Sequence, residues 1–315
     1  MISNAFKTNS RPSSSHAVKG FLFLLVSVLF WGSSAPLAKQ LIVTRFDTLI
    51  VAQTRTTLTF LLLAVFFSFQ NKKIFKIDMH DLWKFCVMGV VGIAATNYTY
   101  YFTAKESSVA TAILVQYTAP VWVVLFAVFI SKEETFDLLT LLSLVLAFLG
   151  CYLAVTGGSL KTISLRGWAT ITGPMSALTY AYQILATKQL LKKYPIWTFL
   201  VYAFGFSALF WFCINPPWRI VAHHYSTSDW GILWLFAIIS ILIPQTAFAF
   251  GLRLLKASTA GIIGVLEPII AIIAAYLLLG EMLSDLQLIG AVIVVASVGL
   301  LQVHPLIMQK VMKVE

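Results

Sequence analysis

Charged residues are scarce in this sequence, and their scarcity excludes an ordinary soluble protein. Asp, Glu, Lys and Arg make up 11% of the 315 residues and hydrophobic residues 59%, whereas about 25% charge is typical of soluble domains. The mean hydropathy is +0.89. The composition therefore predicts an all-α integral membrane protein that crosses the lipid bilayer several times.

Cysteine is also rare, which excludes a disulfide framework and a cysteine-based metal site. The three cysteines lie inside apolar runs and show no CxxC spacing: Cys86, Cys151 and Cys213. The adjacent pair His223-His224 falls on a predicted loop, where two neighbouring residues seldom form a metal site alone. The sequence thus predicts no metal.

Motifs for nucleotide phosphates and for nucleic acid are missing as well. Gly157-Gly158 lacks the GxxxxGK[ST] frame that cradles phosphates, so no ATP or other cofactor is predicted. The net charge of +10 comes from Lys and Arg between the apolar runs, without a basic segment interleaved with aromatic residues. We therefore expect no nucleic-acid partner.

What the chain does contain is ten apolar runs, each long enough for a membrane helix of about 20 residues. The first five are 17–43, 48–69, 82–103, 108–130 and 136–156, and the second five are 166–190, 196–214, 230–252, 258–280 and 285–304. The first run continues past Ala35, where a signal peptide would be cleaved, so it is interpreted as a helix. We predict tails at 1–18 and 305–315, and five-helix units at 19–156 and 166–304.

Basic residues predict the orientation of these segments. If successive segments alternate in direction, 15 of the 22 Lys and Arg lie on the side of the N-terminus, six lie on the other side, and Arg55 is within a helix. Cytoplasmic loops carry the excess of positive charge. Both termini are therefore predicted to be cytoplasmic, in a multi-pass protein of a cell membrane, with a bacterial inner membrane favoured.

The two sets of five runs are related by an internal repeat. Residues 110–133 and 258–281, offset by 148, share Thr, Ala, Pro, Ala and Glu at Thr111/Thr259, Ala112/Ala260, Pro120/Pro268, Ala127/Ala275 and Glu133/Glu281. Because five is odd, the second unit enters the membrane from the opposite side. Such inverted repeats are typical of transporters with a substrate site near the midplane.

Taken together, these features resemble a known family. WGSSAPLAK at 31–39, Arg55 in the second run and LEPIIAIIAAYLLLGE at 266–281 are similar to the EamA family of the drug/metabolite transporter superfamily. The resemblance spans about residues 19–301. It implies a ten-helix bundle that moves small metabolites, amino acids or toxic compounds, often outward.

Two ionisable residues stand out within the runs. Glu267 lies about 14 Å from the nearer end of its helix and Arg55 about 10 Å, at 1.5 Å per residue. A charge at this depth is costly and is therefore a functional hypothesis: Glu267 as a site for a coupling proton, a cation or a substrate amine, and Arg55 for a substrate carboxylate. The alternatives are a helix-packing acid and an arginine that extends to the interface.

Pro120 and Pro268 predict paired interruptions of the two helices. Each proline removes a backbone donor, which leaves the carbonyl groups of Gln116 and Gly264 without their helical partners. Interruptions in corresponding halves indicate a binding site or hinge, and an ordinary kink is the alternative.

Polar and aromatic residues complete the predicted lining of a small-molecule site. They share an apolar surrounding, in which an amide or hydroxyl group facing lipid would be costly. They are Trp31, Ser34, Asn97, Tyr98, Tyr101, Gln116, Tyr117, Tyr180, Gln183 and Gln245. Some could instead join helices by hydrogen bonds or belong to the interfacial aromatic belt.

These features favour a secondary transporter, an exporter of amino acids or other small metabolites working by alternating access, rather than an enzyme. The alternative is a membrane-embedded enzyme that modifies lipid. Such an enzyme needs clustered carboxylates or histidines at a membrane face, and the nearest candidate is Asp78-Met79-His80-Asp81.

Overall fold

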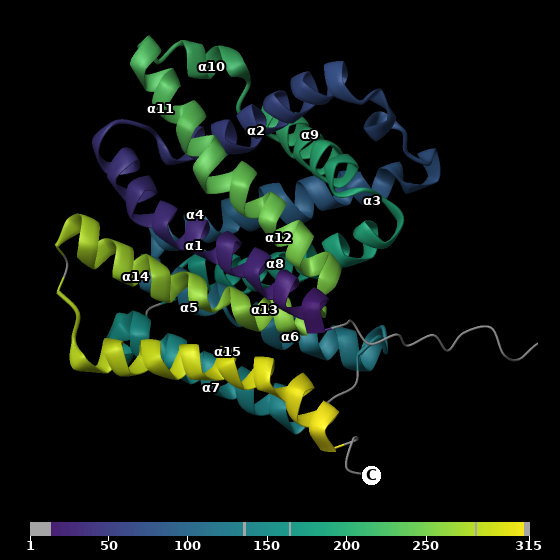
Figure 1. Ribbon diagram of the computed structural model, residues 1–315. Coiled ribbons are helices and arrows are strands. Elements are labelled where there is room, and N and C mark those ends of the chain that lie inside the picture. Colours follow the sequence, from purple (N-terminus) through teal and green to yellow (C-terminus); the bar gives the residue numbers. More distant parts are fainter. Residues whose placement is uncertain (1–13, 135–136, 164, 281, 312–315) are drawn as a thin grey trace, which may run out of the picture.

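The computed structural model describes residues 14–134, 137–163, 165–280 and 282–311, and every regular element in these ranges is helical (Figure 1). Elements of the first half are α1 (Ser14–Thr44), α2 (Thr48–Gln70), η1 (Lys72–Phe75), η2 (Met79–Asp81), α3 (Leu82–Val87), the π-helical η3 (Met88–Ala95), α4 (Thr96–Glu106), α5 (Val109–Gln116), α6 (Ala119–Leu125), the π-helical η4 (Phe126–Ile130) and α7 (Leu138–Thr156).

Elements of the second half follow a short connection that contains η5 (Leu160–Thr162). They are α8 (Ala169–Lys193), α9 (Ile196–Ile214), α10 (Pro217–Val221), α11 (Thr227–Ala237), the π-helical η6 (Ile238–Leu242), α12 (Ile243–Leu254), α13 (Ala257–Gly264), α14 (Leu266–Leu279) and α15 (Asp285–Val311). Glu281, the last position of the repeat noted in the sequence, lies outside the described residues.

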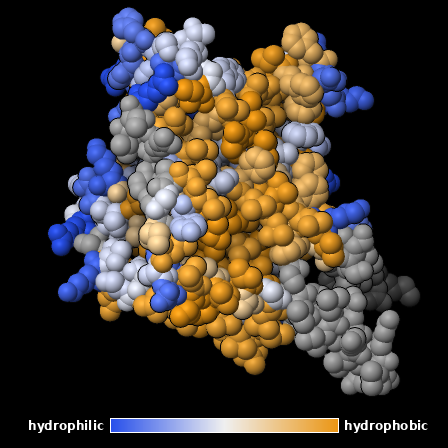
Figure 2. Space-filling view, turned by 60° about the vertical axis from the view of Figure 1, so that its left-hand side comes forward, coloured by the Kyte–Doolittle hydropathy of each residue, from blue (hydrophilic) through white to orange (hydrophobic). Residues whose placement is uncertain are grey.

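Among the described residues, seven helical segments are long and apolar enough to cross a membrane. They are 16–38, 49–70, 109–130, 138–156, 196–214, 227–254 and 257–278. Figure 2 shows hydrophobic residues over most of one face of the molecule, with hydrophilic residues gathered at its margins. Large apolar side chains such as Phe69 and Leu277 are exposed. The protein is therefore an all-helical multi-pass membrane protein.

Three other predicted segments are helical but do not meet the same length and hydropathy criteria. They are Leu82–Glu106, α8 and α15, of which 285–300 is a shorter apolar helix. Polar residues lower the hydropathy of the first, yet their hydroxyl groups are satisfied within the helix: Thr99 donates to the carbonyl oxygen of Ala95 and Thr103 to that of Thr99, both at 2.7 Å. Such bonds reduce the cost of placing threonine in an apolar environment.

Helix packing repeats between the two halves. Helix α1 of the first half packs on α12 and α14 of the second half. Its counterpart α8 of the second half packs on α4 and α6 of the first half. The equivalent helices α2 and α9 pack on each other, as do α7 and α15, which lie side by side along one edge of the bundle (Figure 1). Exchanging the halves reproduces the same set of pairs, as expected for a chain built from two repeats.

Lysines define one end of the bundle. Its turns carry the exposed residues Lys72, Lys73, Lys76, Lys84, Lys132, Lys192, Lys193 and Lys256, and we call it the lysine-rich end. Ion pairs join these turns: Lys193 Nζ lies 3.1 Å from Asp78 Oδ2, and Lys192 Nζ lies 2.8 Å from Glu133 Oε1. The turns are thus tied to one another across the two halves.

Glycine allows the closest helix crossing, between α7 and α15. A Cβ atom added at Gly290 would lie 2.3 Å from the backbone nitrogen of Ala154 and 2.6 Å from the carbonyl oxygen of Gly150. Backbone atoms cannot move aside as a flexible side chain can. Small residues at such crossings let membrane helices approach closely.

We expect Gly290→Ala to destabilise the protein by about 1–3 kcal/mol, because the added methyl group overpacks the crossing. Thermal unfolding in detergent measures the effect. Gly299→Ala is the matched control, since it lies on the same helix and an added Cβ meets nothing within 4 Å. Equal melting temperatures for the two variants would show that the crossing does not limit stability.

Candidate functional site

Two helices are interrupted at equivalent positions of the repeat. The helix α5 ends at Gln116 and α6 begins at Ala119, while α13 ends at Gly264, 148 residues after Gln116, and α14 begins at Leu266. Pro120 and Pro268 lie just beyond these breaks, where their missing N–H groups leave backbone carbonyls free. The interrupted helices contact each other, and a Cβ added at Gly261 would lie 3.5 Å from Pro120.

Glu267 occupies the first turn of α14, directly after the second interruption. Its side chain retains accessible surface although its neighbours Leu266 and Pro268 are buried. The backbone of α1 passes beside it, because a Cβ added at Gly32 would lie 2.7 Å from the carbonyl oxygen of Glu267. The acid therefore lies beside α1 at the start of α14 and is not packed on all sides.

Three tyrosines and an arginine surround this acid. The Tyr117 side chain is close enough to interact with the carboxyl group by hydrogen bonding. Tyr100, Tyr180 and Arg55 lie within electrostatic range of it. Tyr117 and Tyr180 form an edge-on ring pair with centroids 6.3 Å apart. Residues from both repeats thus converge on one carboxyl group.

Arg55 is buried in α2, with 8% of its surface exposed. Its guanidinium group donates to the hydroxyl group of Tyr101 and, at 3.1 Å, to the carbonyl oxygen of Ser240. It also lies over the ring of Phe236, 5.3 Å from the centroid. Its Nε atom is buried without a hydrogen-bond partner among the described residues. The guanidinium group therefore keeps hydrogen-bonding capacity for a ligand, including its Nε–H.

Four of the other predicted site residues are buried, partly exposed or packed against a neighbouring helix, and do not all have their polar groups satisfied. Gln245 is buried, with a side-chain nitrogen that has no partner among the described residues, and Gln116 keeps accessible surface beside the first interruption. Trp31 packs against Phe248 with ring centroids 5.4 Å apart, and Gln183 is buried in α8.

The side chains of Ser34 and Asn97 bond to their own helices instead. Ser34 donates to the carbonyl oxygen of Trp31 at 2.8 Å, and Asn97 donates to that of Ile93 at the same distance. Tyr98 is 44% exposed and stacks against Phe102, with centroids 5.8 Å apart. These contacts of the three side chains are thus made within their own helical segments.

Tyr100 was missed by sequence reasoning, which selected Tyr98 and Tyr101 from the same stretch. The helical period offers a signal for Tyr100, because Tyr100 and Tyr101 lie three and four residues after Asn97 and therefore share one helix face with it. Phe236 of α11 and Ser240 of η6, the partners of Arg55, carry no such signal. Their proximity depends on how the two halves pack.

Asp78 and Asp81, the basis of the enzyme alternative, are held in ion pairs at the lysine-rich end. Asp81 interacts with Lys193, with Lys84 at 2.7 Å and with the hydroxyl group of Tyr194 at 2.7 Å. Lys193, with Lys84 and Tyr194, holds the pKa of the Asp81 carboxyl group well below its ordinary value. A carboxylate bound in this way fixes the α2–α3 connection and is not poised to exchange a proton.

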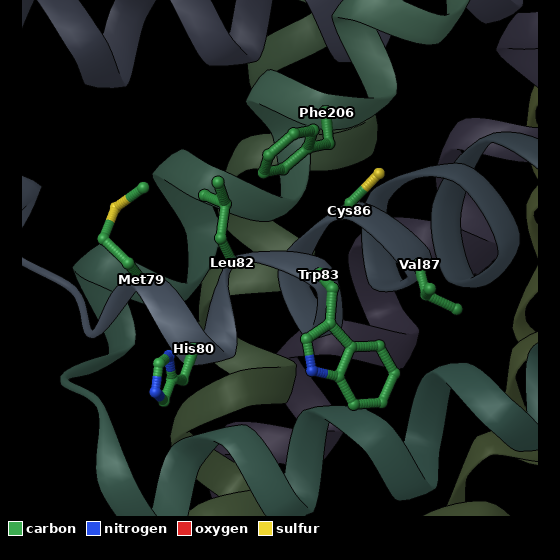
Figure 3. Close-up of a pocket in the computed structure, with 7 residues that line it drawn as sticks. All are labelled: Met79, His80, Leu82, Trp83, Cys86, Val87 and Phe206. Atoms are coloured by element: carbon green, nitrogen blue, oxygen red, sulfur yellow. The ribbon is translucent and has the colours of Figure 1, made fainter.

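Next to these acids lies an open groove of about 640 Å³ (Figure 3). Its lining is mainly apolar and consists of Met79, His80, Leu82, Trp83, Cys86, Val87 and Phe206. His80 and Cys86 are its titratable members, and the described residues contain no group of three His, Cys, Asp or Glu side chains able to hold a metal ion. The side chains that line the groove thus include one imidazole and one thiol but no carboxylate.

Comparison with known proteins gives the same two units that the helix packing shows. A model of the EamA-like transporter family matches residues 18–156 and, a second time, residues 167–303. The chain belongs to the EamA-like transporter family. It is therefore a membrane transporter, which resides in a lipid bilayer and acts on a small-molecule substrate.

Relatives of this EamA-like protein are named as transporters. YicL of Salmonella typhimurium, an uncharacterized inner membrane transporter, is 24% identical over 288 residues, which cover 90% of this chain and 95% of YicL. An uncharacterized transporter of Archaeoglobus fulgidus is 28% identical over 66% of this chain and 74% of its own. The threonine/homoserine exporter RhtA of Salmonella typhimurium is 25% identical over 66% of this chain and 68% of RhtA.

A solved crystal structure has the same fold as this EamA-like chain. The two superpose with a TM-score of 0.72 over 90% of this chain and 96% of the other, at 14% sequence identity.

Proposed function

We propose that this EamA-like protein is a secondary transporter that exports amino acids or similar small metabolites by alternating access. One observation carries the proposal: Glu267, partly exposed in the first turn after the interruption between α13 and α14, lies within electrostatic range of Arg55, a buried arginine of α2 in the other repeat. Opposite charges separated in this way suit a zwitterion, whose carboxylate pairs with Arg55 and whose amine pairs with Glu267.

The proposed topology has ten membrane helices in two inverted repeats, with both termini cytoplasmic. The helical segments 82–106, 169–193 and 285–311 then join the seven apolar spans, and the lysine-rich end faces the cytoplasm. We place the protein in a cell membrane of the bacterial inner-membrane type, as in the name of YicL. Reporters fused at each terminus, active only in the cytoplasm, test this orientation.

Proton coupling through Glu267 is part of the proposal. An acid in an apolar interior binds and releases a proton in response to nearby charge, so that it can alternate between a proton and a substrate amine. The name of RhtA directs the choice of the first substrates, threonine and homoserine.

The test is flux of labelled solute in sealed vesicles that contain the purified protein. We expect threonine, homoserine or a related amino acid to be carried out of vesicles, faster when an imposed proton gradient favours exchange. Vesicles without protein are the control for leakage. Absence of flux over a broad panel of amino acids and small metabolites contradicts the proposal.

A further inference from the structure

Glu134 attaches one repeat to the other at the lysine-rich end. It follows η4 of the first repeat, and its carboxylate accepts hydrogen bonds from the backbone nitrogens of Ala257 at 2.9 Å and Ser258 at 3.4 Å. The hydroxyl group of Ser258 donates to the second carboxylate oxygen. The acid thereby caps the first turn of α13, whose N–H groups have no helical partners.

Lys188 holds the preceding turn in place. Its ammonium group is half-buried in α8 and donates to the carbonyl oxygens of Leu252 and Leu255, each at 2.6 Å. These carbonyls belong to the end of α12, where helical partners run out. The α12–α13 turn is therefore held by a carboxylate on its N–H groups and an ammonium group on its C=O groups.

A further contact beside Glu134 joins the same turn of the first repeat to α8. Glu133, the neighbour of Glu134, accepts hydrogen bonds from Lys192 and Gln189 of α8, both at 2.8 Å. Lys192 lowers the pKa of Glu133, because the ammonium group favours the charged carboxylate. The dipeptide Glu133-Glu134 thus links the end of the interrupted helix in one repeat to α8 and α13 in the other.

The contacts of Glu134 and Lys188 lie at one end of α13, and Glu267 lies beyond its other end. Nine residues separate Ser258 from Glu267, or about 14 Å of helix. Between them, α13 packs against α6 and α8 in a layer of fully buried apolar side chains: Val123, Ile184, Ala260 and Ile263. This layer separates Glu267 from the lysine-rich end, so a path from that end requires α13 to move about the interruption at Val265.

The residues at the positions of Glu134 and Ser258 in the other repeat are not able to form the same hydrogen bonds. Applying the offset of 148 places Met282 opposite Glu134 and Ala110 opposite Ser258, and neither can form the same hydrogen bonds. Met282 is 85% exposed. The two repeats therefore differ in the polar contacts that hold their interrupted helices.

We propose that Glu134 and Lys188 are the latch of a gate that closes the lysine-rich end of the transport path, and that transport requires both to release the α12–α13 turn. The inference rests on the proposed transport function. In the structure described here these contacts are formed and the gate is closed.

Thiol labelling of the buried layer tests the latch without any substrate. Ala260→Cys is introduced after Cys86, Cys151 and Cys213 have been replaced, and a membrane-impermeant maleimide is added from the lysine-rich end. We expect slow labelling in this background and labelling at least about tenfold faster after Glu134→Gln or Lys188→Met, the effect of losing a charge-assisted hydrogen bond. Ser258→Ala, which strands no charge, should give about threefold.

Glu106→Gln is the matched control, an exposed acid on α4 at the opposite end, and it should leave the labelling rate unchanged. Labelling within about twofold of the background in all three latch variants, with melting temperatures retained, overturns the proposal. If the variants at Glu134 and Lys188 do not fold, Ser258→Ala decides. If the wild-type protein carries no solute, the transport function fails, whereas the labelling rates still decide whether the latch closes this end.

Discussion

Glu267→Gln should reduce proton-driven flux by at least about tenfold while leaving the protein folded. Glutamine has nearly the same shape and keeps a carbonyl oxygen that can accept a hydrogen bond, but it cannot take up or release a proton. The loss of a hydrogen bond to a charged group corresponds to about 1.5–3 kcal/mol, or about 10- to 100-fold in binding. Initial rates of labelled amino-acid flux, with and without an imposed pH difference, measure this effect.

The pH response separates coupling from simple binding. The wild-type rate should vary with pH between about 5 and 8, whereas the rate of the variant should not, because glutamine carries no titratable proton. Glu106→Gln removes an exposed acid at the end of α4 and should behave as wild type. A Glu267→Gln protein that keeps the wild-type dependence on the pH difference would remove this acid from the mechanism.

The repeat made the interrupted helices predictable, because a proline acts on the backbone locally. Pro120 and Pro268 remove donors to specific carbonyls, and the structure interrupts the helices at those carbonyls. Glu267 could likewise be singled out from sequence, since a carboxylate within an apolar run is costly wherever the helix packs. Local chemistry of this kind needs no knowledge of the neighbours.

Contacts between distant helices could not be predicted in the same way. Arg55 was recognised, but its partners Tyr101 and Ser240 come from α4 and η6, which pattern alone cannot place beside α2. Tyr98 was also selected from its segment alone, and in the structure its ring stacks against Phe102 of the same helix. Depth along a helix follows from counting residues, whereas facing direction depends on packing.

Asymmetry within the repeat locates the features that one half has and the other lacks. Ala119 occupies the position of Glu267, and Met282 the position of Glu134. Both acids are on or against the interrupted helix α13–α14, one at each end of α13. A two-repeat scaffold supplies paired bends, and these single substitutions supply the proposed coupling group and latch.

Arg55→Lys should reduce the apparent affinity for an amino-acid substrate by about 10- to 100-fold, although the positive charge is kept. The guanidinium group reaches the Tyr101 hydroxyl, the Ser240 carbonyl and the Phe236 ring at once, and its planar fork still has Nε–H unpaired. A lysine ammonium is a compact point charge that cannot make these contacts together with a carboxylate. Concentration dependence of flux measures the change in half-saturation.

Stability distinguishes a binding role from a packing role for this arginine. If Arg55 served only to join α2 to α4 and η6, Arg55→Lys would lower the melting temperature while half-saturation of the remaining folded protein stayed the same. Arg219→Lys, at an exposed arginine of α10, is the matched control and should change neither quantity. Because Nε is the one guanidinium nitrogen without a partner among the described residues, a bound carboxylate should also stabilise the wild-type protein against heat. The Lys variant should lose most of that ligand-dependent stabilisation, and equal stabilisation of both proteins would contradict a carboxylate-binding role.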